Sequence, residues 1–134
     1  EVVIAGIQGN GIYFSKLLAK TLDKISSLKI ILCEVYIDKK NPLNKITTSI
    51  KTIDYENKPI VLVDDVLNSG KTMQYALVKI LQFPTKAIKT LTLVDRKHRR
   101  FPIKANFVGM SLSTTLKQHV EVDLKSKKNK AYLV

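Results

Sequence analysis

Short apolar runs alternate with segments of helical periodicity along this chain. Apolar residues recur every three or four positions from Phe14 to Ile25 and again over residues 72–81, which is typical of helices packed on a sheet. Apolar stretches of strand length fall at residues 2–5, 29–37, 60–63, 87–94, 106–109 and 120–124. Strands that alternate with helices predict an α/β fold, a single domain with a mainly parallel central sheet flanked by helices.

The segments between these elements are less regular. A glycine-rich turn at residues 6–11 separates the first strand from the first helix, and residues 38–43 form a turn-rich break. Residues 46–53 alternate well enough to predict an exposed strand or a hairpin arm. Residues 106–109 and 120–124 complete the predicted sheet. We therefore expect a domain over residues 1–124 and a solvated, mobile basic tail over residues 125–134.

Charge is the compositional outlier of the chain. Its 134 residues include 23 Lys and Arg against 11 Asp and Glu, and the formal net charge of +12 favours anionic partners such as phosphorylated substrates or nucleic acid. No apolar run is long enough to span a bilayer and no signal peptide is recognised, so we expect a cytoplasmic protein without a membrane partner. The single cysteine, Cys33, lies in an apolar run, which predicts a buried core residue and excludes an internal disulfide.

Residues 60–73 join a buried strand to a helix through a short polar loop. Four apolar residues run directly into Asp64 and Asp65, and the loop 66–72 contains one glycine and the hydroxyls of Ser69 and Thr72. Acids at the carboxyl end of a buried strand lie where open α/β sheets bind their ligands. The backbone N–H groups of the loop and of the helix start can bind one phosphate, and the acids are placed for sugar hydroxyls or a metal ion.

Three other interpretations of the glycine-containing segments explain less. An ATP-binding P-loop would need a glycine where this chain has Asp65, and that motif has no acids before its loop. A dinucleotide-binding turn at Gly9 and Gly11 would place its third small residue at Phe14, which is too bulky for close helix–strand packing. A plain strand followed by a capped helix explains one acid and one hydroxyl, but not two acids, a glycine loop and a hydroxyl helix start together.

The stretch from Ile60 to Thr72 resembles the phosphoribosyl pyrophosphate signature of the type I phosphoribosyltransferases. A second segment narrows the resemblance: Val94-Asp95-Arg96-Lys97-His98-Arg99-Arg100-Phe101-Pro102-Ile103, followed by Asn106-Phe107-Val108-Gly109. This segment is similar to the Val-Asp-Arg-Gly-His-Arg, Leu-Pro-Ile and aromatic-Val-Gly run of the bifunctional pyrimidine operon attenuator and uracil phosphoribosyltransferase family. The resemblance covers residues 2–124.

The resemblance implies transfer of phosphoribose from phosphoribosyl pyrophosphate to a nucleobase, with Mg²⁺ as cofactor and no protein nucleophile. Asp64 and Asp65 would contact the ribose hydroxyls, directly or through Mg²⁺-bound water. The ribose phosphate would lie in a cradle formed by Leu67, Asn68, Ser69, Gly70, Lys71 and Thr72. The base pocket would be formed by Val94, Asp95, Arg96, Val108 and Gly109. We expect Arg99 and Arg100 to face solvent.

The chain departs from the family pattern at two loops. The turn that would bind the leaving pyrophosphate consists of Ile7, Gln8, Gly9 and Asn10. The attenuator proteins usually have Lys or Arg, then Thr and Arg, before the last glycine of this turn, so two cationic donors are missing here. The loop after the second strand has Tyr36-Ile37-Asp38-Lys39 where the family has Tyr-Arg-Asp-Asp. Residues 41–49 remain a candidate lid, with Lys45 as a phosphate contact.

Two functions of different classes follow from the sequence. The first is a Mg²⁺-dependent phosphoribosyltransferase acting on a free base, a pyrimidine such as uracil, to make a nucleoside monophosphate. The second is a catalytically weak, nucleotide-sensing regulator of pyrimidine genes that binds RNA. The signature favours the first, whereas the altered turn and the positive charge favour the second. We expect a homo-oligomer, a dimer, and the family pattern implies a helix upstream of residue 1.

Overall fold

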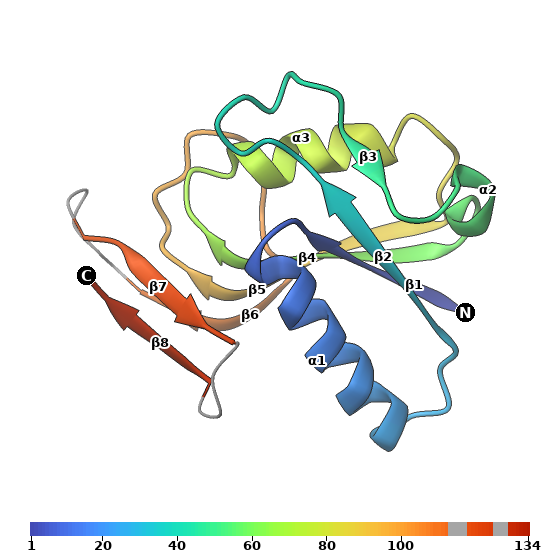
Figure 1. Cartoon of the computed structure of the whole chain (residues 1–134), viewed down its shortest axis with the longest axis horizontal. Coiled ribbons are helices and arrows are strands. Elements are labelled where there is room, and N and C mark those ends of the chain that lie inside the picture. The colour runs from blue at the N-terminus through green and yellow to red at the C-terminus, as the bar shows by residue number, and fades with distance from the viewer. Residues whose placement is uncertain (113–117, 125–128) are drawn as a thin grey trace.

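The computed structural model describes the whole chain except residues 113–117 and 125–128. Its centre is a six-stranded sheet with the strand order β3-β2-β1-β4-β5-β6 (Figure 1). The strands are β1 (Val2–Ile7), β2 (Ile30–Tyr36), β3 (Thr47–Thr48), β4 (Pro59–Leu67), β5 (Ala87–Asp95) and β6 (Phe107–Ser111). Every neighbouring pair is parallel except β2 and β3, which confirms the predicted mainly parallel sheet.

The middle of the sheet is formed by β1 and β4, which pair in parallel with Val3 opposite Ile60 and Gly6 opposite Val63. All residues of β1 from Val3 to Ile7 are buried, as expected for a strand covered on both faces. Because the strands are parallel, the loops that follow β1, β4 and β5 leave the sheet at the same edge. That edge is where open α/β sheets bind their ligands.

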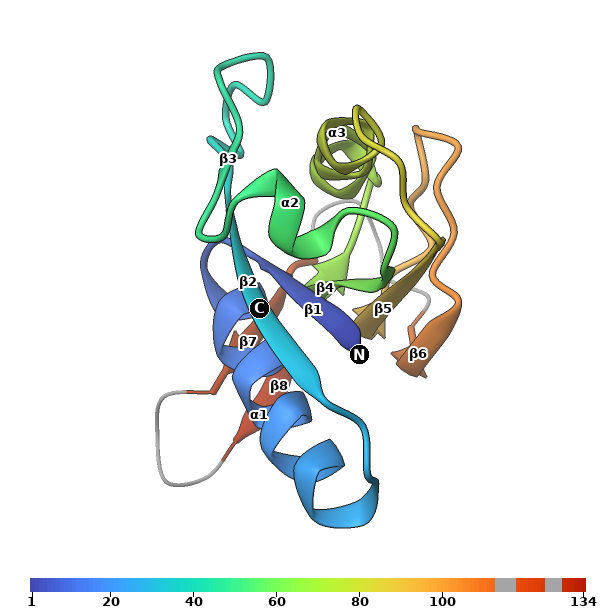
Figure 2. The ribbon, with the colours of Figure 1, turned by 90° about the vertical axis from the view of Figure 1, so that its right-hand side faces the viewer.

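Helices cover both faces of the sheet (Figure 2). α1 (Asn10–Ile25) lies on one face, and α2 (Thr52–Tyr55) and α3 (Lys71–Ile80) lie on the other. α3 buries Met73, Ala76 and Ile80, which follow the helical spacing of the sequence and belong to the main hydrophobic cluster. Cys33 on β2 is also in this cluster, as predicted. No helix among the described residues is both long and apolar enough to cross a membrane.

Small residues let α1 approach the sheet closely. A Cβ on Gly6 would lie 2.4 Å from Ser15 Oγ and 2.7 Å from the Gly11 carbonyl oxygen, so a side chain at this position would collide with α1. A Cβ on Gly11 would lie 3.0 Å from Asp64 Oδ1. The amino-terminal end of α1 is therefore held directly against the acidic end of β4.

A separate antiparallel hairpin lies beside α1, formed by β7 (Val120–Asp123) and β8 (Lys130–Leu133) (Figure 1). The side chain of Asn10 donates a hydrogen bond to the Val122 carbonyl at 2.7 Å and so links the hairpin to the start of α1. The prediction that residues 120–124 complete the main sheet is wrong, because their partner is β8. The expected mobile tail is also interrupted, since Lys130–Leu133 is a strand, while residues 125–128 lie outside the described part of the chain.

Three other boundaries differ from the sequence-based expectation. β4 continues past the acids to Leu67, so the loop before α3 is only residues 68–70 rather than 66–72. α1 begins at Asn10, inside the predicted glycine-rich turn, and α3 spans Lys71–Ile80. Within residues 46–53 only Thr47–Thr48 form a strand, because α2 begins at Thr52.

Candidate functional site

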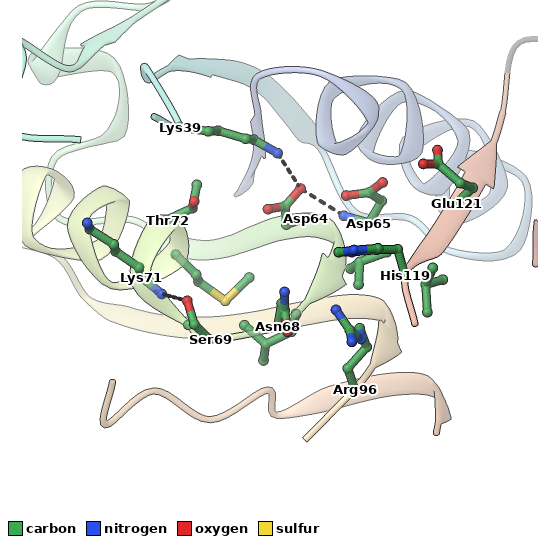
Figure 3. A pocket seen from close by; sticks show the side chains of 15 residues that line it. Lys39, Asp64, Asp65, Asn68, Ser69, Lys71, Thr72, Arg96, His119 and Glu121 are labelled. Atoms are coloured by element: carbon green, nitrogen blue, oxygen red, sulfur yellow. Dashed lines mark hydrogen bonds and ion pairs between the residues drawn. The ribbon is translucent and has the colours of Figure 1, made fainter. Parts of the chain in front are cut away.

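A cavity of about 340 Å³ opens at the carboxyl end of β4 (Figure 3). The end of β4, the short loop and the start of α3 form its floor, and Lys39, Arg96 and β7 contribute to its walls. All residues predicted for the sugar and the phosphate line this one cavity: Asp64, Asp65, Leu67, Asn68, Ser69, Gly70, Lys71 and Thr72. The structure brings these eight residues together, and their roles in binding stay predictions.

The loop between β4 and α3 is held from outside the cavity by the segment that follows β5. The Leu67 carbonyl accepts a hydrogen bond from the Arg96 N–H at 3.0 Å, and the Ser69 carbonyl accepts one from the Phe101 N–H at 3.0 Å. These bonds fix the direction of the peptide planes in the loop.

Arg99 completes this support with its side chain. Its Nη1 donates to the Asn68 carbonyl at 2.7 Å, its Nε donates to the Ile103 carbonyl at 3.1 Å, and its Nη2 lies 2.6 Å from Asp95 Oδ1. Asp95 Oδ1 also accepts the Lys97 N–H at 2.8 Å. The expectation that Arg99 faces solvent is therefore wrong, because its guanidinium group spans two backbone segments and a carboxylate.

The support leaves a set of N–H groups for a ligand. In a trans peptide the N–H points away from the C=O, so carbonyls held by residues 96–101 turn the N–H groups of Asn68, Ser69 and Gly70 the other way. The N–H groups of Thr72 and Met73 belong to the first turn of α3, where no intrahelical acceptor exists. Across the described residues, none of these five N–H groups has a protein acceptor. Together with the positive end of the helix dipole they fit an anion such as a phosphate.

Gly70 is the residue on which this geometry depends. Its φ of 87° is left-handed, and it ends the loop and starts α3. A Cβ here would lie 2.2 Å from Ile103 Cγ2, so any other residue would be strained and would collide with the supporting segment. The glycine of the signature is thus explained by local geometry.

The two acids have different environments. Asp64 is only 4% exposed, and its Oδ1 lies 3.5 Å from Lys39 Nζ and accepts the Asp65 N–H at 2.9 Å (Figure 3). Burial raises the pKa of Asp64 to about 8, an effect that the positive charge of Lys39 offsets in part. Asp65 is half-buried. A side chain at the end of a strand is ordinarily partly exposed, but Asp64 is buried because β4 continues beyond it and the start of α1 covers it.

Asp64 and Asp65 suit a divalent cation whose other donors come mainly from the bound substrate and from water. No group of three or more His, Cys, Asp or Glu side chains that could hold a metal occurs among the described residues. Mg²⁺ prefers hard oxygen donors and commonly binds through one or two carboxylates together with waters and substrate phosphates. Asp64 and Asp65 supply such oxygens, and the lysine beside Asp64 marks a position where positive charge is already stabilised.

The side chains of the predicted pyrophosphate turn are buried or hydrogen-bonded within the protein. Ile7 is fully buried as the last residue of β1. The Gln8 side chain accepts the Ile37 N–H at 3.0 Å, and Asn10 holds Val122 of the hairpin. Gly9 has a φ of 94° and lies beside Lys39, whose Nζ would be 4.0 Å from a Cβ at Gly9.

The residues predicted for the base pocket separate into several places. Arg96 lines the central cavity, whereas Val94 and Gly109 line an apolar cavity of about 600 Å³ between α1, β5, β6 and the hairpin. Asp95 is bound to Arg99, and Val108 is 39% exposed on the edge strand β6. Neither the central cavity nor the apolar cavity is lined by all five of these residues. Val120 lines both cavities, so a base seated beside the central cavity would contact the hairpin.

Three residues of the central cavity were not among those predicted from the sequence. His119 and Glu121 reach the cavity from the hairpin, and Lys39 reaches it from the loop between β2 and β3. The pattern of the chain places residues 120–124 in the main sheet, which hides the proximity of β7 to the acids. A departure from the family pattern at Lys39 is the one hint in the sequence.

The fold and this site define a phosphoribosyltransferase, and the comparison with known families agrees. The phosphoribosyl transferase domain family matches residues 1–127, and the chain belongs to this family. Within it, the chain is similar to Bifunctional protein PyrR of Limosilactobacillus reuteri subsp. reuteri, at 35% identity over 91% of this chain and 74% of that protein. Bifunctional protein PyrR of Haemophilus ducreyi is 32% identical over 91% of this chain and 73% of its own length. These relatives confirm the predicted family.

Solved structures of the same fold are more distant in sequence. A point mutant of the hypoxanthine phosphoribosyltransferase of Trypanosoma cruzi, complexed with its product IMP, superposes with a TM-score of 0.72 at 17% identity. That match covers 83% of this chain and 57% of the solved chain. A hypoxanthine-guanine phosphoribosyltransferase of Bacillus anthracis gives a TM-score of 0.66 at 18% identity, over 83% of this chain and 65% of that one. This chain thus spans less than two thirds of either solved chain, and the likeness confirms the fold.

Proposed function

We propose that this protein is a phosphoribosyltransferase that uses phosphoribosyl pyrophosphate and a free pyrimidine base, such as uracil, to make a nucleoside monophosphate. The observation that carries the proposal is the cradle of unpaired N–H groups at residues 68–73 directly beside Asp64 and Asp65. A sugar phosphate needs this combination, because the phosphate takes the N–H groups while its ribose hydroxyls reach the acids. The likeness to the PyrR proteins supports the pyrimidine assignment.

In the proposed reaction, the bond between ribose C1 and the pyrophosphate oxygen breaks with its electron pair leaving on pyrophosphate. A nitrogen of the base forms the new bond to C1, and its proton passes to solvent. Positive charge develops on the sugar, as at other glycosidic centres. Asp64 and Asp65 orient the ribose hydroxyls, and the cradle fixes the phosphate so that C1 is presented to the base. Asp64 and Asp65 would hold Mg²⁺, which would supply positive charge for the leaving pyrophosphate.

The test is a screen of free bases with phosphoribosyl pyrophosphate and Mg²⁺ in which pyrophosphate release is measured. We expect uracil to give the highest rate. The double variant Asp64→Asn, Asp65→Asn is expected to lose Mg²⁺-dependent binding of phosphoribosyl pyrophosphate while it stays folded, because neither change removes an apolar core side chain. Calorimetry that shows unchanged affinity in this variant would overturn the roles of the acids.

A second function, regulation through RNA, is supported by a basic groove next to the cradle. The groove has a volume of about 580 Å³ and is lined by Asn68, Ser69, Arg96, Lys97, His98, Arg99, Arg100 and His119. We propose that it binds RNA phosphates in a cytoplasmic homodimer. Phosphate-driven binding weakens steeply with salt. A titration of RNA at several salt concentrations should show that the affinity falls steeply as the salt concentration rises. The double variant Lys97→Ala, Arg100→Ala should make this fall less steep. RNA affinity equal in the two proteins at every salt concentration would exclude the groove.

A further inference from the structure

A second polar cavity adjoins the glycine-rich turn on the side of β2. It has a volume of about 530 Å³ and is lined by Gln8, Gly9, Tyr36, Ile37, Asp38, Lys39, Lys40, Lys45 and Thr47. Three of these side chains are lysines and one is an acid. The Asp38 carboxylate is already engaged, because it accepts the N–H groups of Lys40 and Asn41 and an amide N–H of Asn44. The cavity therefore has an excess of positively charged side chains, whereas the adjoining glycine-rich turn has no charged side chain.

Lys39 connects this cavity to the central one. Its side chain lines both cavities and is 43% exposed. Its Nζ lies 3.5 Å from Asp64 Oδ1 and, on the other side, faces the open backbone of Gly9. Apart from the residues adjoining Gly9 in the chain, no other described atom lies within 4 Å of its Cβ position, so a ligand can approach the turn there. An anion bound between the turn and the acids would contact the Lys39 ammonium group directly.

We propose that Lys39, Lys40 and Lys45 supply the positive charge for the leaving pyrophosphate, in place of the cations that the resembled family has in its glycine-rich turn. The inference rests on the proposed function and extends it. The turn itself cannot supply this charge, because Gln8 and Asn10 are neutral and their side chains hold Ile37 and Val122. The loop between β2 and β3 supplies it from the opposite wall.

The arrangement also gives Lys39 two sequential partners. In the free protein its ammonium group lies 3.5 Å from Oδ1 of the buried Asp64 side chain. When the ribose hydroxyls of a bound sugar phosphate reach Asp64 and Asp65, the ammonium group of Lys39 would turn from Asp64 toward the pyrophosphate side of Gly9. Binding of the sugar would thus place the lysine where negative charge grows as the C1–O bond breaks.

The test compares the binding of pyrophosphate with the binding of uridine monophosphate, which has no pyrophosphate group. Wild-type protein, the triple variant Lys39→Gln, Lys40→Gln, Lys45→Gln and a control variant are titrated calorimetrically with pyrophosphate and with uridine monophosphate, both with Mg²⁺. The control, Lys20→Gln, Lys24→Gln, Lys86→Gln, removes the same charge from exposed positions away from both cavities. We expect the triple variant to lose about tenfold or more in pyrophosphate affinity, since each exposed charge pair contributes up to about fivefold. Uridine monophosphate affinity should fall much less, and the control should match the wild type.

The outcomes separate this inference from the proposed function. A wild-type protein that binds uridine monophosphate but releases no heat with pyrophosphate would overturn the lysine assignment and leave the nucleotide site standing. Equal loss in the triple variant and in the control would attribute the effect to net charge and would also overturn it. A wild-type protein that binds neither ligand would overturn both. The double variant Lys40→Gln, Lys45→Gln keeps the Lys39–Asp64 pair, and it should lose affinity for pyrophosphate even if the triple variant is poorly folded.

Discussion

Asp64 is a buried carboxyl group, and its burial disfavours the ionised form. The start of α1, β4 and the Asp65 N–H surround it, and Lys39 is its charged neighbour. Its pKa is raised to about 8, first by burial. A carboxyl group with a raised pKa is held more easily in its neutral form, so the folded state binds a proton that the unfolded state releases above about pH 4.

This difference predicts a pH dependence of stability. The contribution of Asp64 is fully present below about pH 4 and is lost as the pH rises to about 8, with a slope of up to about 1.4 kcal/mol per pH unit. Asp64→Asn removes the titration. The free energy of unfolding of the wild type, measured by denaturant without Mg²⁺, should therefore decline relative to that of the variant from pH 5 to pH 8. Parallel profiles for the two proteins would show that Asp64 does not titrate in this window.

Arg99 and Arg100 are neighbours with opposite environments, which makes them a matched pair for mutation. Arg99 holds the loop carbonyl of Asn68 and pairs with Asp95, whereas Arg100 is exposed. Arg99→Met keeps the aliphatic stem but removes these bonds, and hydrogen bonds of charged groups contribute about 1.5–3 kcal/mol each. We expect a lower melting temperature and about tenfold weaker binding of uridine monophosphate.

The control for that change is Arg100→Met, which removes the same charge one residue away. It should leave both the melting temperature and the affinity close to the wild-type values. If Arg99→Met lowers the melting temperature but leaves nucleotide affinity intact, Arg99 stabilises the fold without positioning the loop.

At the scale of elements, the site is formed by one contiguous segment, from β4 to α3, and by two segments distant from it in the sequence, the hairpin and the loop between β2 and β3. The strand, loop and helix from β4 to α3 are contiguous, so their apolar run, acids and glycine were enough to predict that these residues lie together. The hairpin and the loop between β2 and β3 reach the same cavity from far along the chain. The hairpin is held by Asn10 with Val122 and by Arg96 with the Gln118 carbonyl, and no periodicity encodes such pairs. The position of β7 and the role of Arg99 could not be predicted for this reason.

The glycine-rich turn can be given the charge that the resembled family has there. Gln8→Lys with Asn10→Arg places two cations beside Gly9, and donors to a developing anion are worth about two to three orders of magnitude in rate when preorganised. The same changes remove the bonds to Ile37 and Val122. We expect pyrophosphate release to become faster while the melting temperature falls. Unchanged turnover in a folded variant would show that the missing charge in the turn does not limit catalysis.

At the scale of the whole molecule, the positions of the charges determine how monophosphate binding compares with the turnover of phosphoribosyl pyrophosphate. The net charge of +12 favours anionic ligands over distance, and the N–H groups of the cradle have no protein acceptor among the described residues. Turnover needs cations on the leaving pyrophosphate, and here three lysines in a surface loop replace a rigid turn. Side chains that must be ordered on binding are less effective than preorganised donors. Nucleotide binding should therefore be strong in comparison with catalysis.

We predict that the protein binds uridine monophosphate readily but turns over phosphoribosyl pyrophosphate more slowly than an ordinary enzyme, for which about ten turnovers per second is typical. The measurement pairs a calorimetric titration of the monophosphate with a steady-state assay of pyrophosphate release at saturating uracil and Mg²⁺. Raising the ionic strength should reduce turnover more than monophosphate binding, because exposed lysines are screened by salt whereas backbone N–H groups are screened much less. Turnover at or above about ten per second would contradict the prediction, since the lysine loop would then be as effective as a charged turn.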